Sequence, residues 1–186
     1  MKVEKHGFVI NKKIEIYKSF IDDKKLLNYF KNKIKKDVGA NNFVTNVKGQ
    51  MSLFDSFLKD EKFLDFINKK FLPGMFSANN ISHENSSLYE MRIMAAWGNI
   101  LNKGHYVQEH VHGSAEFSST LYFSKGEPFR TEAGVFEIEE GLILTFPGYL
   151  THWVNPIKEK ERISMVWNWD ILSRNFKSSK NIWKEI

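Results

Sequence analysis

The sequence predicts a mainly β fold with N-terminal helices, in which the strands form a sandwich or a barrel. Apolar residues recur at helical spacing in the first half, and short apolar stretches separated by turn residues follow one another from Leu88 onward. The length of 186 residues and the 42% hydrophobic content suit one domain with a large buried core. We therefore expect a single domain over 1–186, with a mostly helical support layer over 1–80 and a β core that carries the site over 81–186.

Two stretches of the first half have helical periodicity. In 22–36, four apolar residues share one helical face, and either of two adjacent Asp residues can cap the start. These apolar residues are Leu26, Leu27, Phe30 and Ile34. The stretch 52–72 repeats the pattern as one helix or as two helices broken near Asp60, and we expect Pro73 and Gly74 to end it.

The second half predicts seven strands. They are expected at 89–101, 106–112, 117–123, 134–140, 141–147, 151–157 and 162–169. Such a succession of short strands is typical of sandwiches and barrels. The polar stretch 79–87 is expected to join the helical layer to the sheet, and 124–134 is expected to be a loop.

Composition and missing motifs exclude several functions. The chain has no cysteine, so disulfides, thiolate metal sites and Cys nucleophiles are excluded, and a metal must be held by His and carboxylate. The sequence contains no P-loop, no dinucleotide fingerprint and no Gly-x-Ser-x-Gly motif. These absences exclude the usual kinases, dehydrogenases and α/β-hydrolases.

Charge and hydropathy bear on location and partners. No apolar run approaches the roughly 20 residues of a membrane span, and the N-terminus lacks the apolar region of a signal peptide, so we expect a cytoplasmic protein with no membrane partner. The net charge of +5 is mild. The basic run 31–36 places Ile34 inward, so its lysines are expected to form a solvated helix face rather than a nucleic-acid site. Exposed Phe residues on the helical layer would favour a homodimer.

Three histidines form a candidate metal site. His110 and His112 stand two apart in a predicted strand, so their side chains leave the same face and their nitrogens can converge on one ion. His152 follows a predicted strand that ends in Pro-Gly, which would deliver it near the mouth of the barrel. The alternative is that these are hydrogen-bonded or solvent-facing histidines without a chemical role.

The last predicted strand carries a candidate anion-binding residue. Large apolar side chains occupy every second position of this strand, so we expect that face to pack on the helical layer. Arg162 and Ser164 lie on the opposite face and are expected to point into the barrel. A buried arginine needs an anionic partner. That partner is either Glu159 or Glu161, in a structural role, or a ligand carboxylate that Arg162 binds in a fork with help from Ser164.

The order and spacing of these residues resemble the 2-oxoglutarate- and Fe(II)-dependent dioxygenases, most closely an uncharacterised bacterial and phage subgroup. The positions that carry the likeness are Trp97, Asn99, Gly104, His110, His112, Ser118 and Tyr122, then Phe146, Pro147, His152, Glu161, Arg162, Ile163 and Ser164. A segment ahead of the predicted barrel is also similar, so the resemblance covers most of the chain.

The resemblance implies a double-stranded β-helix, which is a cupin-like jelly-roll barrel. It also implies a reaction, in which O2 and the cosubstrate 2-oxoglutarate yield succinate and CO2 while a small-molecule or peptide substrate is hydroxylated. The implied Fe(II) ligands are His110, His112 and His152. The implied cosubstrate residues are Arg162 and Ser164 for the distal carboxylate, with Asn99 and Tyr106 as candidates for its other end.

One position departs from the common pattern of that family. The usual ligand set is two His and one carboxylate, and His112 stands where the acid would be. Three neutral imidazoles leave the iron one charge unit more positive.

Two rival interpretations stay open. The stretch 104–116 is also similar to the first cupin motif, in which Glu116 would join the three histidines as a fourth metal ligand without 2-oxoglutarate. A third hypothesis is a metal-free jelly-roll module that binds a sugar or a protein through surface tryptophans.

Overall fold

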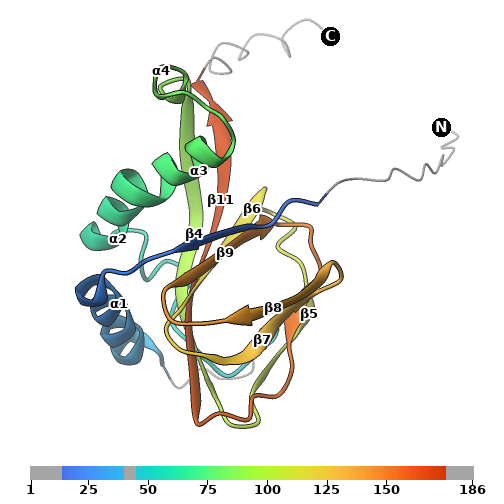
Figure 1. Ribbon diagram of the computed structural model, residues 1–186. Helices are drawn as coiled ribbons and strands as arrows, with labels where there is room; N and C mark the ends of the chain where they lie inside the picture. Colours follow the sequence, from blue (N-terminus) through green and yellow to red (C-terminus); the bar gives the residue numbers. More distant parts are fainter. Residues whose placement is uncertain (1–13, 40–44, 175–186) are drawn as a thin grey trace, which may run out of the picture.

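The computed structural model describes residues 14–39 and 45–174 (Figure 1). Parts of the predicted helical layer at 1–13 and 40–44, and the C-terminal residues 175–186, lie outside the described residues. Two antiparallel sheets face each other, and helices α1 to α3 cover the outer face of the larger sheet (Figure 1). The mainly β jelly-roll prediction is confirmed, with the two sheets not joined into a closed barrel.

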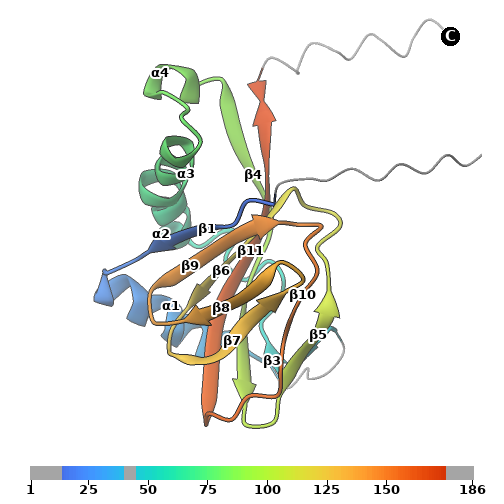
Figure 2. The same ribbon diagram turned by 45° about the vertical axis from the view of Figure 1, so that its right-hand side comes forward.

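The larger sheet has six strands in the order β1-β9-β6-β11-β4-β3. Their bounds are β1 Tyr17–Phe20, β9 Leu142–Pro147, β6 Phe117–Tyr122, β11 Glu161–Ser173, β4 Tyr89–Asn102 and β3 Gln50–Met51. The smaller sheet has five strands in the order β2-β5-β10-β7-β8. Their bounds are β2 Val47–Lys48, β5 Tyr106–His110, β10 His152–Val154, β7 Gly126–Thr131 and β8 Gly134–Ile138. The long strands β4 and β11 pair along their whole length and extend beyond the other strands (Figure 2).

Helix α1 (Lys24–Asp37) forms where the periodicity predicts it. Asp23 is the cap, because its Oδ1 accepts a hydrogen bond from the Leu26 N–H at 3.0 Å. The buried Ile34 rests directly on Gly98 of β4, where a Cβ would lie 2.4 Å from Ile34 Cγ1. The absence of a side chain at this glycine therefore lets the helix approach the sheet closely.

The second helical segment differs from its prediction. Residues 54–59 form turns, and the helix begins only after Asp60, whose Oδ1 accepts a hydrogen bond from the Phe63 N–H at 2.9 Å. It runs through α2 (Glu61–Phe66), the π-helical turn η1 (Ile67–Phe71) and α3 (Leu72–Ala78). The expectation that Pro73 and Gly74 end the helix is wrong. Pro73 lies in the first turn of α3, directly after the π turn, and the helix continues through it to Ala78.

Five short elements of the structure were not predicted from the sequence. Three strands of the first half, β1, β2 and β3, join the sheets, so the helical layer and the β core do not separate at residue 80. The predicted loop 124–134 contains β7, and the predicted joining stretch 79–87 contains the short helix α4 (His83–Ser86). Pro128 is tolerated in β7 because it lies at a register shift between Gly126 and Phe129, where the ladder is interrupted.

The main core lies between the helical layer and the six-stranded sheet. Trp167 of β11 is fully buried there, with its ring 5.1 Å from Phe71 and 5.9 Å from Phe63 between centroids. The predicted apolar face of β11 is confirmed. Its members Ile163, Met165, Trp167 and Trp169 all belong to this cluster. Among the described residues, no helix is both long and apolar enough to span a membrane.

Candidate metal centre

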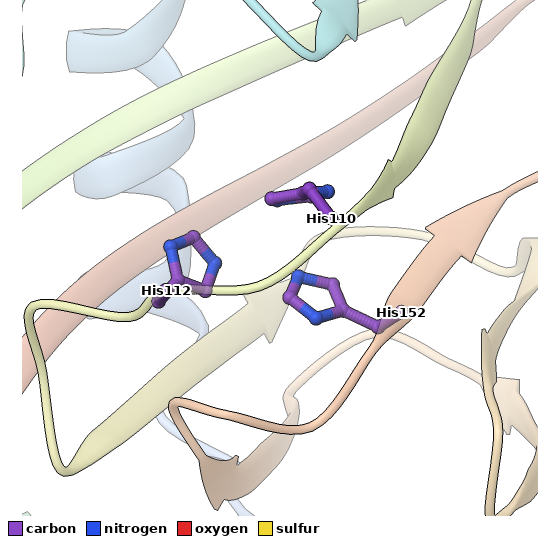
Figure 3. A group of neighbouring side chains, drawn as sticks. All are labelled: His110, His112 and His152. Carbon is purple, nitrogen blue, oxygen red and sulfur yellow. The ribbon is translucent and has the colours of Figure 1, made fainter. Parts of the chain in front are cut away.

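The structure brings the three predicted histidines together (Figure 3). His110 ends β5, His152 begins β10, and the two are direct cross-strand partners. His112 follows two residues after His110. One ring nitrogen from each of the three lies within 4.8 Å of the others, and within the described ranges no other cluster of His and carboxylate side chains meets this spacing. The spacing suits a single ion bound by three imidazoles.

His112 reaches the cluster from outside the strand, because β5 ends at His110. Its backbone N–H donates to the carbonyl of Gly148 at 2.7 Å, and the Gly148 N–H donates to the carbonyl of Glu116 at 2.8 Å. A Cβ on Gly148 would lie 2.0 Å from the carbonyl oxygen of Ala115, so only glycine allows this contact. The backbone around Gly148 thus fixes the position of His112.

Hydrogen bonds orient the rings of the other two histidines. Nδ1 of His110 lies 2.8 Å from the carbonyl of Gln108, and Nδ1 of His152 lies 2.8 Å from the carbonyl of Leu150. Because a carbonyl only accepts, each Nδ1 carries the proton and each Nε2 keeps its lone pair. This is the tautomer that binds a metal through Nε2.

Burial keeps the cluster uncharged. It lowers the pKa of His112 to about 4 and that of His152 to about 3, and it also lowers the pKa of His110. The nearby His110 contributes further to the lowering at the other two. All three rings are therefore neutral at pH 7, which is the form that coordinates metal.

The stability of the metal-free protein is expected to fall in mild acid. The unfolded chain takes up protons on these histidines below their ordinary pKa of 6.5, whereas folded His112 and His152 stay neutral down to about pH 4 and 3. The stabilisation is therefore present above pH 6.5 and is lost as the pH falls, by about 2 kcal/mol for the pair between pH 7 and 5.5. Urea unfolding of the metal-free chain at both pH values measures this loss. A double variant with glutamine at both positions should show a smaller loss, and an equal loss would contradict the prediction.

A pocket opens beside the histidines between the two sheets. Its lining includes Asn99, Arg162 and Ser164, as predicted. Its apolar wall is formed by Val47, Val107, Phe129, Val154 and Val166, and Trp97, Thr120 and Tyr122 complete the lining with the three histidines. The Oδ1 of Asn99 accepts a hydrogen bond from the Trp97 indole at 3.1 Å, which fixes that side chain at the pocket wall.

Arg162 is a buried cation without an anionic partner. It is 3% exposed, its Nε has no hydrogen-bond partner, and no carboxylate of the described residues forms an ion pair with it. Glu161, one of the two predicted structural partners, instead binds Lys35 Nζ at 2.9 Å. Burial lowers the pKa of the guanidinium, and the neighbouring Tyr122, followed by the charges of Glu159 and Glu127, offsets this only in part. The guanidinium carbon lies 5.1 Å from the centre of the Tyr122 ring, so its closest support is a cation–π contact. These residues fit an anionic ligand.

Two predicted residues are not brought to the site. Tyr106 is 37% exposed and does not line the pocket, whereas its neighbour Val107 does. The pairing of β5 with β10 is irregular, with His110 opposite His152 but Val107 opposite Val154, and this bulge reverses which side chains face inward.

Glu116, the fourth ligand of the cupin interpretation, also points elsewhere. Its Oε2 accepts a hydrogen bond from the Ile171 N–H at 3.0 Å, and its carboxylate is not part of the histidine cluster. The carboxylate thus links the residue just before β6 to the backbone of β11. The structure does not support a four-ligand site.

The sequence interpretation missed two residues of the site. Tyr122 belongs to the motif, but its contact with the Arg162 guanidinium was not predicted. Asn168 lies on β11, and its contact with His112 at 3.2 Å could not be predicted, because it depends on the loop conformation after β5.

Comparison with known proteins gives matches in structure only. No protein-family model matches the chain, and no curated protein matches its sequence. The viral collagen prolyl hydroxylase vCPH of Paramecium Bursaria Chlorella virus-1, in its 2-oxoglutarate complex, matches with a TM-score of 0.61 at 15% identity, over 86% of this chain and 96% of the other.

Two further solved structures match over similar lengths. HygX of Streptomyces hygroscopicus, with nickel, 2-oxoglutarate and hygromycin B bound, has a TM-score of 0.59 at 8% identity, over 83% of this chain and 82% of HygX. A prolyl-4-hydroxylase of Pseudomonas putida has a TM-score of 0.56 at 14% identity, over 83% of this chain and 91% of the other. The resemblance seen in the motifs therefore extends to the whole fold: this chain has the double-stranded β-helix of the 2-oxoglutarate- and Fe(II)-dependent oxygenases.

Proposed function

We propose that the chain is a non-haem Fe(II)- and 2-oxoglutarate-dependent oxygenase. It hydroxylates a small-molecule or peptide substrate and releases succinate and CO2. The observation that carries the proposal is Arg162, a buried cation with no anion, in the same pocket as three convergent neutral histidines. The fold match to vCPH and HygX, both solved with 2-oxoglutarate, supports it.

In this proposal the three histidines bind the metal, and Arg162 and Ser164 bind the cosubstrate. The Nε2 atoms of His110, His112 and His152 would hold Fe(II), which when bound would supply O2 activation and would be chelated by the keto acid. Arg162 receives the distal carboxylate of 2-oxoglutarate, and Ser164 on the same strand face adds a hydrogen bond. The valine-rich wall keeps water from the cosubstrate, which strengthens these charged contacts.

Charge explains how three neutral ligands can serve. A triad with one carboxylate leaves a divalent ion with one positive charge, whereas this triad leaves two. The dianionic cosubstrate would place one carboxylate at the metal and the other at Arg162, so the ion would keep one positive charge where the common triad keeps none. The site therefore depends on the cosubstrate for its charge balance more than a site with a carboxylate ligand does.

Visible absorption of the anaerobic protein tests the proposal. We expect one Fe(II) per chain and a charge-transfer band when 2-oxoglutarate is added, because the keto acid chelates the metal. Succinate, which lacks the keto group, is the control and should give no band. Iron binding without a band, or no iron binding, would overturn the proposal. The substrate and the homodimer stay predictions.

A further inference from the structure

Asn168 of β11 is a buried polar side chain in contact with His112. It is 8% exposed, and its Nδ2 lies 3.2 Å from Nδ1 of His112. Its Oδ1 is buried and has no hydrogen-bond partner among the described residues. A buried oxygen without a hydrogen-bond partner destabilises the fold, so this arrangement needs an explanation.

The chemistry of the ring supplies one. A neutral histidine that binds a metal through Nε2 carries its proton on Nδ1, so Nδ1 is a donor and needs an acceptor. The two ends of an amide have nearly the same shape, and the hydrogen-bond network decides which end faces the ring. Turning the Asn168 amide by half a turn places Oδ1 against the Nδ1 proton. This single change provides the acceptor and satisfies the orphan oxygen.

The other two histidines each have an acceptor for the Nδ1 proton. Backbone carbonyls of Gln108 and Leu150 accept the Nδ1 protons of His110 and His152. His112 lies beyond the end of β5, and its Nδ1 faces a side chain instead. Asn168 thus stands where the third acceptor is needed.

We propose that Asn168 is a positioning residue for His112. Its side-chain oxygen accepts the Nδ1 proton, which fixes the tautomer and ring angle of His112 and raises the basicity of its Nε2. This inference rests on the proposed function, because it assumes a metal at the triad. It also explains how a histidine serves at the position where the common ligand set has a carboxylate.

The opposite amide orientation makes a different prediction. If Nδ2 donated to Nδ1 of His112, the ring proton would sit on Nε2 and face the other histidines. An aspartate at position 168 would then remove the donor and abolish the interaction. In the proposed orientation, an aspartate keeps the acceptor and strengthens it with a negative charge.

Two variants of nearly equal size separate these cases. Asn168→Leu removes the acceptor and is expected to lower Co(II) and Fe(II) affinity 10–100-fold, measured by competition with a chromophoric chelator. Asn168→Asp is expected to bind both metals at least as tightly as the wild type. With 2-oxoglutarate, it should also move the charge-transfer band to longer wavelength, because a more basic His112 makes the iron richer in electrons.

Ser119→Ala is the matched control. Ser119 lies on the adjacent strand β6 and is buried, and its hydroxyl accepts a hydrogen bond from the Trp169 indole at 2.9 Å, on the helical side of the same sheet. This variant loses a buried hydrogen bond without touching the triad, so its metal affinity should equal that of the wild type. Far-ultraviolet circular dichroism checks the fold of each variant.

Two results would overturn the inference while leaving the proposed function intact. Asn168→Leu could bind metal as tightly as the wild type, or Asn168→Asp could lose as much affinity as Asn168→Leu. A wild-type chain that bound no metal would overturn the proposed function instead, and the inference with it.

Discussion

Arg162→Met is expected to weaken 2-oxoglutarate binding at least tenfold and, at the same time, to stabilise the ligand-free protein. The loss follows because a charge-assisted hydrogen bond to the distal carboxylate contributes about 1.5–3 kcal/mol. The gain follows because the variant removes a buried cation that has no anionic partner in the ligand-free chain. A merely structural arginine would give the opposite sign for stability.

The two effects are measured separately. Titration of the Fe(II) protein with 2-oxoglutarate gives the affinity, and thermal unfolding of the ligand-free chain gives the stability. Arg130→Met is the control, because Arg130 has its own carboxylate in Glu127 at 3.4 Å and does not line the pocket. Unchanged 2-oxoglutarate affinity in Arg162→Met would count against the whole assignment of this pocket.

His152→Ala is expected to lower metal affinity by more than about 100-fold, since the loss of a hydrogen-bond partner of a ligand alone costs 10–100-fold. His152 is the most buried of the three histidines, at 4% exposure, and its ring centre lies 4.2 Å from that of His110 and 5.0 Å from that of His112. Its removal leaves two nitrogens where the site needs three. His110→Ala should have a similar effect.

Chelator competition with Co(II) measures this loss, and circular dichroism checks that the fold persists. His105→Ala is the control, because His105 precedes β5 and its Nδ1 accepts a hydrogen bond from the Asn102 N–H at 3.1 Å, away from the triad. Metal affinity that survived in both triad variants would show that the histidines are not the ligands.

The accuracy of the sequence predictions depended on the regularity of each element. Strand β11 alternates without a break from Arg162 to Asn168, so both its core face and its pocket face could be predicted. Tyr106 was a candidate only through the family resemblance, and the bulge in the pairing of β5 with β10 turns Val107 toward the pocket in its place. The histidine cluster was predicted from strand parity over 106–112, but β5 ends at His110, and the loop held at Gly148 brings His112 to the other two histidines.

Other features depend on contacts that no local pattern contains. The helix continues past Pro73, which directly follows a π turn that the local sequence does not indicate. The position of His112 depends on Gly148, which is 36 residues away in the sequence and meets it only in the folded chain. The contact between Asn168 and His112 depends on the conformation of that loop, so it could not be predicted from the sequence.

The placement of the three histidines has a mechanical consequence. His110 and His152 belong to the five-stranded sheet, whereas His112 abuts Asn168 of the six-stranded sheet. A cation at the triad would therefore link the edge of the five-stranded sheet to the six-stranded sheet through the contact of His112 with Asn168. Adding or removing the cation is then expected to change how firmly the two sheets are held together beside the pocket.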